Sequence, residues 1–249
     1  MKETYILEAC VDSVESAVAA DRGGADRLEL CANLVIGGTT PSMELYRRVR
    51  EKVDIPVHVL IRPRFGAFLY SEEEYEIMRR EIRSFIREGA DAVVFGSLNA
   101  DGTINEEQMK GMMEAAGGKP VTLHRAFDVC RDPWEALDTA KKLGIHTILT
   151  SGQEASCYDG RELLKELEET SRGSVEIMAG GGVCAEIIET LRDMSEICCF
   201  HMSGKETLES GMIYRNPKVN MGLPGISEFE VWRTSEEAIR RAVQVLKNR

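Results

Sequence analysis

Short apolar runs rich in β-branched residues alternate with amphipathic helical stretches along the whole chain. Eight runs have the length and composition of buried strands, and they span 5–10, 27–31, 57–61, 92–95, 121–124, 147–150, 175–179 and 199–202. A stretch of helical periodicity follows each, over 13–22, 42–52, 71–88, 105–116, 133–142, 159–171, 186–194 and 236–248. Eight strand–helix units without a low-complexity linker predict one (β/α)8 TIM barrel domain over residues 1–249.

One connection breaks this regular alternation of strands and helices. The segment between the eighth strand and the last helix, residues 203–235, is far longer than the usual few residues and contains Asn216-Pro217 and the stretch 221–225, MGLPG. Its length predicts a functional lid.

The charge balance narrows the class of partner. The chain has 31 basic and 42 acidic residues and a net charge of −11, which repels nucleic acid and anionic membranes. Its first residues, MKETYILEACVDS, lack the apolar stretch of a signal peptide, and no apolar run approaches the length of a membrane span. We therefore expect a cytoplasmic protein without nucleic-acid or membrane partners.

The pattern Glu-x-Cys occurs twice, as Glu8-Ala9-Cys10 and Glu29-Leu30-Cys31, each at the end of a predicted strand. The two-residue period of a strand puts each glutamate and its cysteine on one face, so on neighbouring strands the two cysteines would lie side by side. Two thiols can hold a soft metal ion, and two carboxylates can hold a cation or transfer protons. Seven cysteines without a Cys-x-x-Cys pattern indicate reduced thiols rather than disulfides or a zinc finger.

Basic residues gather near the carboxyl ends of the third and fifth predicted strands. Arg62 and Arg64 follow the third strand, and Arg125 and Asp128 follow the fifth. The carboxyl ends of barrel strands form the active-site mouth, so the three arginines predict a clamp for a small anion, with Asp128 in the same loop. The alternative is a salt-bridge network in which the arginines only neutralise Glu8 and Glu29.

Glycine-rich loops follow the last two strands. Gly180, Gly181 and Gly182 come after the seventh strand, and Ser203-Gly204 after the eighth. In phosphate-binding barrels the backbone N–H groups of these loops bind the phosphate, which predicts an anion site; ordinary turn glycine is the alternative.

The histidines divide by position. His124 and His201 lie at the mouth and, with Glu8 and Glu29, are the candidate acid–base or hydrogen-bonding groups. His58 is expected to be a hydrogen-bonded core residue, and His146, at the opposite end of a strand, a structural one.

These same segments resemble a known family. The stretch LEACVDSVESAVAADRGGADRLELCANLVIGGTTPS, with HVLIRPRFGAF, TLHRAFD, ILTSG, IMAGGGV and FHMSG, is similar to the CutC family almost from end to end. The resemblance implies a single-domain, cytosolic and often oligomeric TIM barrel linked to copper homeostasis. The cysteines that the family implicates in copper binding correspond to Cys10 and Cys31.

Three readings follow from these features. The first is a protein of copper homeostasis that holds Cu(I) between Cys10 and Cys31, without an organic cofactor. The second is an enzyme acting on a small anionic metabolite, phosphorylated or not, through the arginines and the mouth carboxylates or histidines. The third is a barrel whose mouth is only a structural charge network. We also expect a homo-oligomer.

Overall fold

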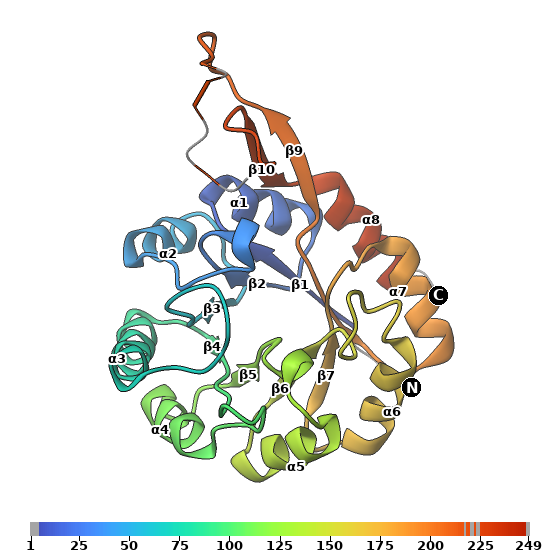
Figure 1. The fold of residues 1–249 in the computed structure, drawn as a ribbon. Coiled ribbons are helices and arrows are strands. Elements are labelled where there is room, and N and C mark those ends of the chain that lie inside the picture. Colours follow the sequence, from blue (N-terminus) through green and yellow to red (C-terminus); the bar gives the residue numbers. More distant parts are fainter. Residues whose placement is uncertain (1–4, 217, 220–221, 223–224, 248–249) are drawn as a thin grey trace.

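A computed structural model describes residues 5–216, 218–219, 222 and 225–247, and these form a closed barrel of eight parallel strands ringed by helices (Figure 1). The barrel strands are β1 Ile6–Val11, β2 Arg27–Leu30, β3 Val57–Leu60, β4 Ala92–Phe95, β5 Val121–Leu123, β6 Thr147–Thr150, β7 Glu176–Ala179 and β8 Cys199–Met202. The helices are α1 Val14–Gly23, α2 Met43–Arg50, α3 Glu72–Glu88, α4 Glu106–Ala116, α5 Pro133–Leu143, α6 Arg161–Ser171, α7 Ala185–Met194 and α8 Glu236–Lys247, with short 3-10 turns at Leu34–Ile36 and Phe127–Val129. The predicted TIM barrel is confirmed; the predicted end of the last helix, Asn248, lies outside the described residues.

Local signals in the sequence fix the helix ends. Ser71 caps α3 by accepting the N–H of Glu74 while the Glu74 side chain accepts the N–H of Ser71, a reciprocal capping box. Asp132 caps α5, with Pro133 in the first turn, and Gly144 ends this helix in the left-handed conformation.

The barrel closes through pairing of the first strand with the last. In the ladder between β1 and β8, Glu8 lies opposite His201, and in the ladder between β1 and β2 it lies opposite Arg27. Outside the sheet, α1 approaches α8 so closely that a Cβ on Gly23 would lie 2.7 Å from the Cβ of Ile239. The two ends of the chain are therefore joined in both the strand layer and the helix layer.

The long connection after β8 contains a hairpin, and its role as a lid stays a prediction. Strands β9 Lys205–Glu209 and β10 Glu230–Thr234 pair antiparallel in a separate two-stranded sheet. This hairpin, called the arm below, extends outward past α1 and α8 rather than across the barrel (Figure 1). Of the segment that we expected to form the lid, Pro217, Asn220, Met221, Leu223 and Pro224 lie outside the described residues.

Candidate functional site at the barrel mouth

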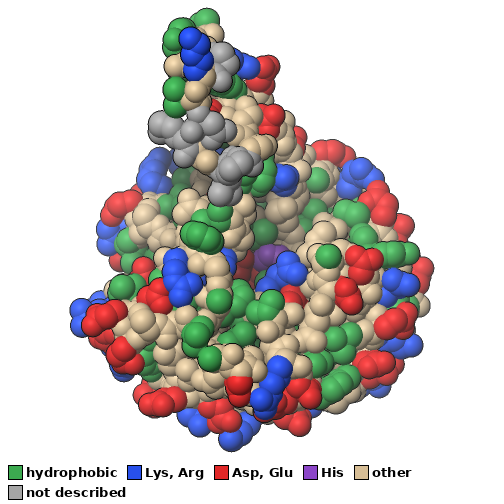
Figure 2. All heavy atoms as spheres, in the orientation of Figure 1, with side chains coloured by type: hydrophobic (Ala, Val, Ile, Leu, Met, Phe, Trp, Pro, Cys, Tyr) green, Lys and Arg blue, Asp and Glu red, His purple; other side chains and the backbone are tan. Residues whose placement is uncertain are grey.

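A cavity of about 250 Å³ opens at the carboxyl ends of the barrel strands. We call it the mouth cavity. Figure 2 shows a hollow at the centre of this face, with a histidine in it and a basic side chain beside it. The predicted site residues that line it are Cys10, Glu29, Cys31, Arg62, His124, Arg125, Gly181, Gly182, His201 and Ser203. Its volume suits a small metabolite better than a dinucleotide.

A buried charge network centred on Glu8 lies beneath the cavity. The Glu8 carboxylate is fully buried; it accepts a hydrogen bond from Arg27 Nε at 2.6 Å, and its other oxygen lies 2.7 Å from His201 Nδ1. His58 Nδ1 lies 3.4 Å from the same carboxylate but makes no well-formed hydrogen bond, so His58 is buried without the partner that we expected. Burial opposes ionisation of Glu8, yet Arg27 and the two histidines hold its pKa well below the usual value.

Arg27 is the functional residue that sequence reasoning missed. It starts β2 and lies opposite Glu8 in the strand ladder, and its guanidinium also contacts the sulfur atoms of Met178 and Cys199. The available signal was its spacing, because Arg27 precedes Glu29 by two residues and so shares its inward face. Arg27, not the mouth arginines, neutralises Glu8.

The two mouth cysteines are close but not in register. Cys10 lies opposite Glu29 in the ladder, so Cys31 is displaced by two residues along β2, and the predicted side-by-side placement is wrong in this detail. Both thiols nevertheless pack in one small buried cluster with Leu60 and Val94. The Cys31 thiol lies 3.3 Å from Glu29 Oε2 and donates to it.

The proton states around the thiols follow from burial and charge. Burial and the Glu29 carboxylate raise the pKa of Cys31 well above its usual value, and burial raises the pKa of Glu29. Burial alone would lower the pKa of His201, but attraction to Cys10 and Glu29 and hydrogen bonds with Cys10 and Glu8 raise it well above the usual value. His201 is therefore an imidazolium at neutral pH.

Arg62 is buried, with 8% of its surface exposed, and its guanidinium is bound by backbone carbonyl groups rather than by a carboxylate. Its Nη1 donates to the carbonyls of Gly37 and Gly38, and its Nη2 to that of Gly66. Within the described part of the chain, no carboxylate pairs with it. The alternative in which the mouth arginines neutralise Glu8 and Glu29 is therefore wrong for Arg62.

Arg125 and Arg64 differ in position. Arg125 lines the cavity; its Nε donates to Asp128 and its Nη2 to Ser151 Oγ. Asp128 does not line the cavity but orients Arg125 and accepts the N–H of Ser151. Arg64 pairs with Glu74 at the start of α3 and is not among the residues lining the cavity, so the three-arginine clamp reduces to two.

The predicted loop glycines also divide. Gly181 and Gly182 line the cavity with positive φ angles of 93° and 82°. Gly180 is packed below it, where a Cβ would lie 2.4 Å from Leu149, and Gly204 packs near Ile239. Only two of the four glycines can therefore offer backbone groups to a ligand in the cavity.

His124 is a buried, neutral imidazole with an unused nitrogen. Its Nδ1 accepts the N–H of Ala126, and its Nε2 has no hydrogen-bond partner although the residue is only 4% exposed. Burial and the nearby charge of Arg62 lower the pKa of His124 to about 3. Because Nδ1 is the acceptor, Nε2 carries the proton.

One group of side chains in the described residues has the spacing of metal ligands. Glu8, Glu29 and His201 offer ligand atoms that lie within 4.8 Å of one another. Oxygen and imidazole donors suit harder cations than Cu(I), which prefers thiolates. Glu8 is already bound to Arg27, which makes this group less suited to a metal ion.

Similarity to known proteins gives the family. The CutC family model matches residues 5–206. The chain is 44% identical to the human copper homeostasis protein cutC homolog, over 98% of this chain and 90% of that protein, and 45% identical to a CutC family protein of Bacteroides fragilis, over 97% of each. A structure of CutC from Streptococcus agalactiae superposes with a TM-score of 0.75 at 32% identity, covering 80% of this chain and 99% of that one.

None of the helices in the described residues is long and apolar enough to cross a membrane. The predicted cytoplasmic location and homo-oligomer stay predictions. The barrel, the mouth cavity lined by Cys10 and Cys31, and the agreement over nearly the whole chain lead to one conclusion: this protein belongs to the CutC family.

Proposed function

We propose that this protein binds Cu(I) through Cys10 and Cys31, in the copper homeostasis role for which its relatives are named. One observation carries the proposal. Of the seven cysteines, these two line the mouth cavity, and they belong to the same buried cluster. Two thiolates are the ligands that Cu(I) prefers in proteins.

Glu29 has a supporting role in this proposal. The Cys31 thiol is protonated before copper arrives, because its pKa is raised, and metal binding must release that proton. Glu29 Oε2, 3.3 Å from the sulfur, is the acceptor at hand. Burial raises the pKa of Glu29, which favours transfer of the thiol proton to this carboxylate.

The test is competition for Cu(I) against a strong chelator under reducing conditions. Wild type should bind one Cu(I), and the Cys10→Ser/Cys31→Ser double variant should lose it, because serine hydroxyls are poor ligands for this soft ion. Cys184→Ser, a change at a cysteine outside the cavity, is the matched control. Unchanged copper stoichiometry in the double variant would reject the assignment.

A second function is favoured by a separate observation. Arg62 is a buried cation without a carboxylate partner among the described residues, and it lines the cavity beside Phe68, whose ring centre lies 4.9 Å from the guanidinium carbon. A buried charge is costly unless it is paired. We propose that a small anionic metabolite supplies the missing negative charge, as the substrate of an enzyme acting at the mouth.

Phosphate is the first probe for this second function. At a hundredfold excess over its dissociation constant, a bound anion stabilises the fold by about 2.7 kcal/mol, measured as a rise in melting temperature. Arg62→Met should remove the rise. If a panel of small phosphates and carboxylates leaves the wild-type melting temperature unmoved, the second function is wrong.

A further inference from the structure

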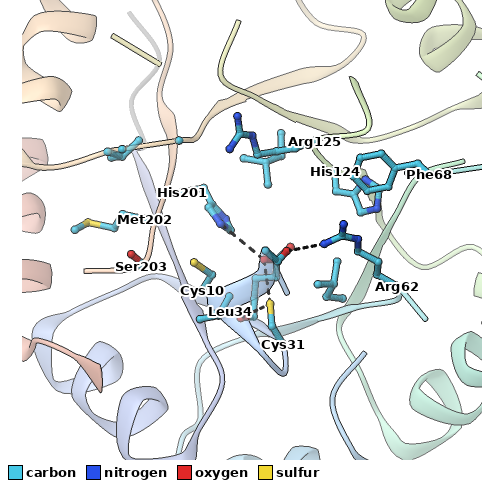
Figure 3. Close-up of a pocket in the computed structure, with 17 residues that line it drawn as sticks. Cys10, Cys31, Leu34, Arg62, Phe68, His124, Arg125, His201, Met202 and Ser203 are labelled. Carbon is cyan, nitrogen blue, oxygen red and sulfur yellow. Dashed lines mark hydrogen bonds and ion pairs between the residues drawn. The ribbon is translucent and has the colours of Figure 1, made fainter. Parts of the chain in front are cut away.

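The donors of the mouth cavity form two separate groups. Figure 3 shows Arg62, His124 and Phe68 on one side of the cavity, Cys10 and Cys31 on a second, and Arg125 across from the cysteines. Leu60 and Leu149 also line it. A ligand that used both groups of donors would therefore need two polar ends joined by a short apolar segment.

The first group offers one neutral donor next to one fixed charge. His124 Nε2–H has no partner, and its ring packs 4.6 Å from that of Phe68, on which Arg62 also stacks. The Nη atoms of Arg62 donate to three backbone carbonyls, and its Nε is buried without a hydrogen-bond partner. Two unpartnered N–H groups and one positive charge suit a singly charged carboxylate, which has two acceptor oxygens.

The second group offers more donors. Arg125 has committed Nε and Nη2, and its Nη1 makes no hydrogen bond to a described residue. It lies beside Gly181, where a Cβ would come within 3.5 Å of it. The N–H groups of Gly181 and Gly182 likewise have no partner in the part of the chain that the structure describes. Several N–H groups and a guanidinium suit a phosphate, with its three acceptor oxygens.

We infer that the mouth cavity binds a small phosphorylated carboxylic acid, with its carboxylate on His124 Nε2–H beside Arg62 and its phosphate on Arg125, Gly181 and Gly182. This inference rests on the second proposed function, that the cavity takes a small anion. It adds the class of that anion and its direction in the cavity. His124 has a binding role here, as a fixed hydrogen-bond donor to the carboxylate.

The inference is tested with three probes on the full-length, copper-free, reduced protein. The probes are inorganic phosphate, acetate and 2-phosphoglycolate, which carries both groups. Calorimetry should give 2-phosphoglycolate an affinity at least tenfold above that of either single-group probe, because its second end binds at a high effective concentration.

Substitutions then assign each end. His124→Leu should weaken 2-phosphoglycolate about tenfold or more and leave inorganic phosphate unchanged, since only a hydrogen bond to the carboxylate is lost. His124→Gln, which keeps an N–H donor, should recover part of the loss. Arg125→Met should weaken both phosphate and 2-phosphoglycolate. His146→Leu is the matched control, because His146 also accepts a backbone N–H at Nδ1, from Val121, but is exposed and far from the mouth.

A spectroscopic measurement needs no variant. Nitrogen-detected NMR of the imidazoles should show His124 as the Nε2–H tautomer at neutral pH, with its Nε2 proton shifting downfield on addition of 2-phosphoglycolate but not of phosphate. The Nδ1–H tautomer, or equal affinity for phosphate and 2-phosphoglycolate, would overturn this inference and leave the anion proposal standing. Failure of all three probes to bind would overturn both.

Discussion

Arginine and histidine have different roles in the two halves of the barrel mouth. On the side of β1, β2 and β8, the Glu8 carboxylate is bound by Arg27 and His201, and all three are charged. On the side of β3 and β5, Arg62 donates to backbone carbonyls and stacks on Phe68, with no carboxylate partner among the described residues, and His124 keeps one N–H unused. In the first half, which we call the closed half, the charged side chains pair with one another and stabilise the barrel. In the second, the open half, Arg62 and His124 can still bind a ligand. A structural charge therefore differs from a binding one in whether a charged partner is already present, not in residue type.

The largest expected effect on stability comes from removing the Glu8 charge in the closed half. Glu8→Gln keeps the shape of the side chain but leaves the Arg27 charge without its partner, which should lower the free energy of unfolding by roughly 3–5 kcal/mol. Urea unfolding measures the change. Glu74→Gln is the matched control, because it loosens an ion pair to Arg64 that is partly exposed and should cost less than about 1 kcal/mol. Equal losses in the two variants would show that the comparison between the halves is mistaken.

A smaller effect is expected from the pH dependence of the open half. His124 is neutral in the folded protein, with a pKa of about 3, whereas the unfolded chain takes up a proton there below a pKa of about 6.5. The stability that it contributes is therefore present above pH 6.5 and is lost as the pH falls toward 3. Between pH 7 and pH 5 wild type should lose about 2 kcal/mol more than His124→Gln. Parallel profiles from chemical denaturation would contradict the neutral state.

The smallest effect is expected at Arg64. This arginine is turned toward Glu74 and outside the cavity, so Arg64→Met should change stability by less than about 1 kcal/mol. It should also leave any phosphate-induced rise in melting temperature intact, unlike Arg62→Met. A loss of that rise in Arg64→Met would place Arg64 in the anion site and restore the three-arginine clamp.

The sequence predicts the barrel well because its signals are local. Strand composition places every barrel strand to within one residue of its observed bounds, and caps such as Asp132 and the glycine after α5 mark the helix ends. The sequence did not predict the strands of the arm, because β9 and β10 are far apart in the sequence and form a sheet of their own beside the barrel.

The candidate site depends on register and loop direction, which spacing does not fix. Cys10 faces Glu29 rather than Cys31 because of the stagger between the strands. Arg62 and Arg64 are two residues apart, yet one lines the cavity and the other pairs with a helix start. Both follow the end of β3 at Leu60, where the two-residue period of a strand no longer sets the direction of the side chains. Arg27 was missed because its partner, Glu8, lies on another strand.

The pairing of β1 with β8 also constrains the order in which the contacts of the barrel form during synthesis. Glu8 and His201 are 193 residues apart in sequence, and contacts of such long separation form late because the chain between them must be ordered first. On the ribosome, β1 and β2 emerge early, and Glu8 can meet Arg27 at once, but one edge of β1 stays open until β8 has been synthesised. The contact between Glu8 and Arg27 can thus form early in translation. The contact between Glu8 and His201 forms only when β8 pairs with β1 and closes the barrel.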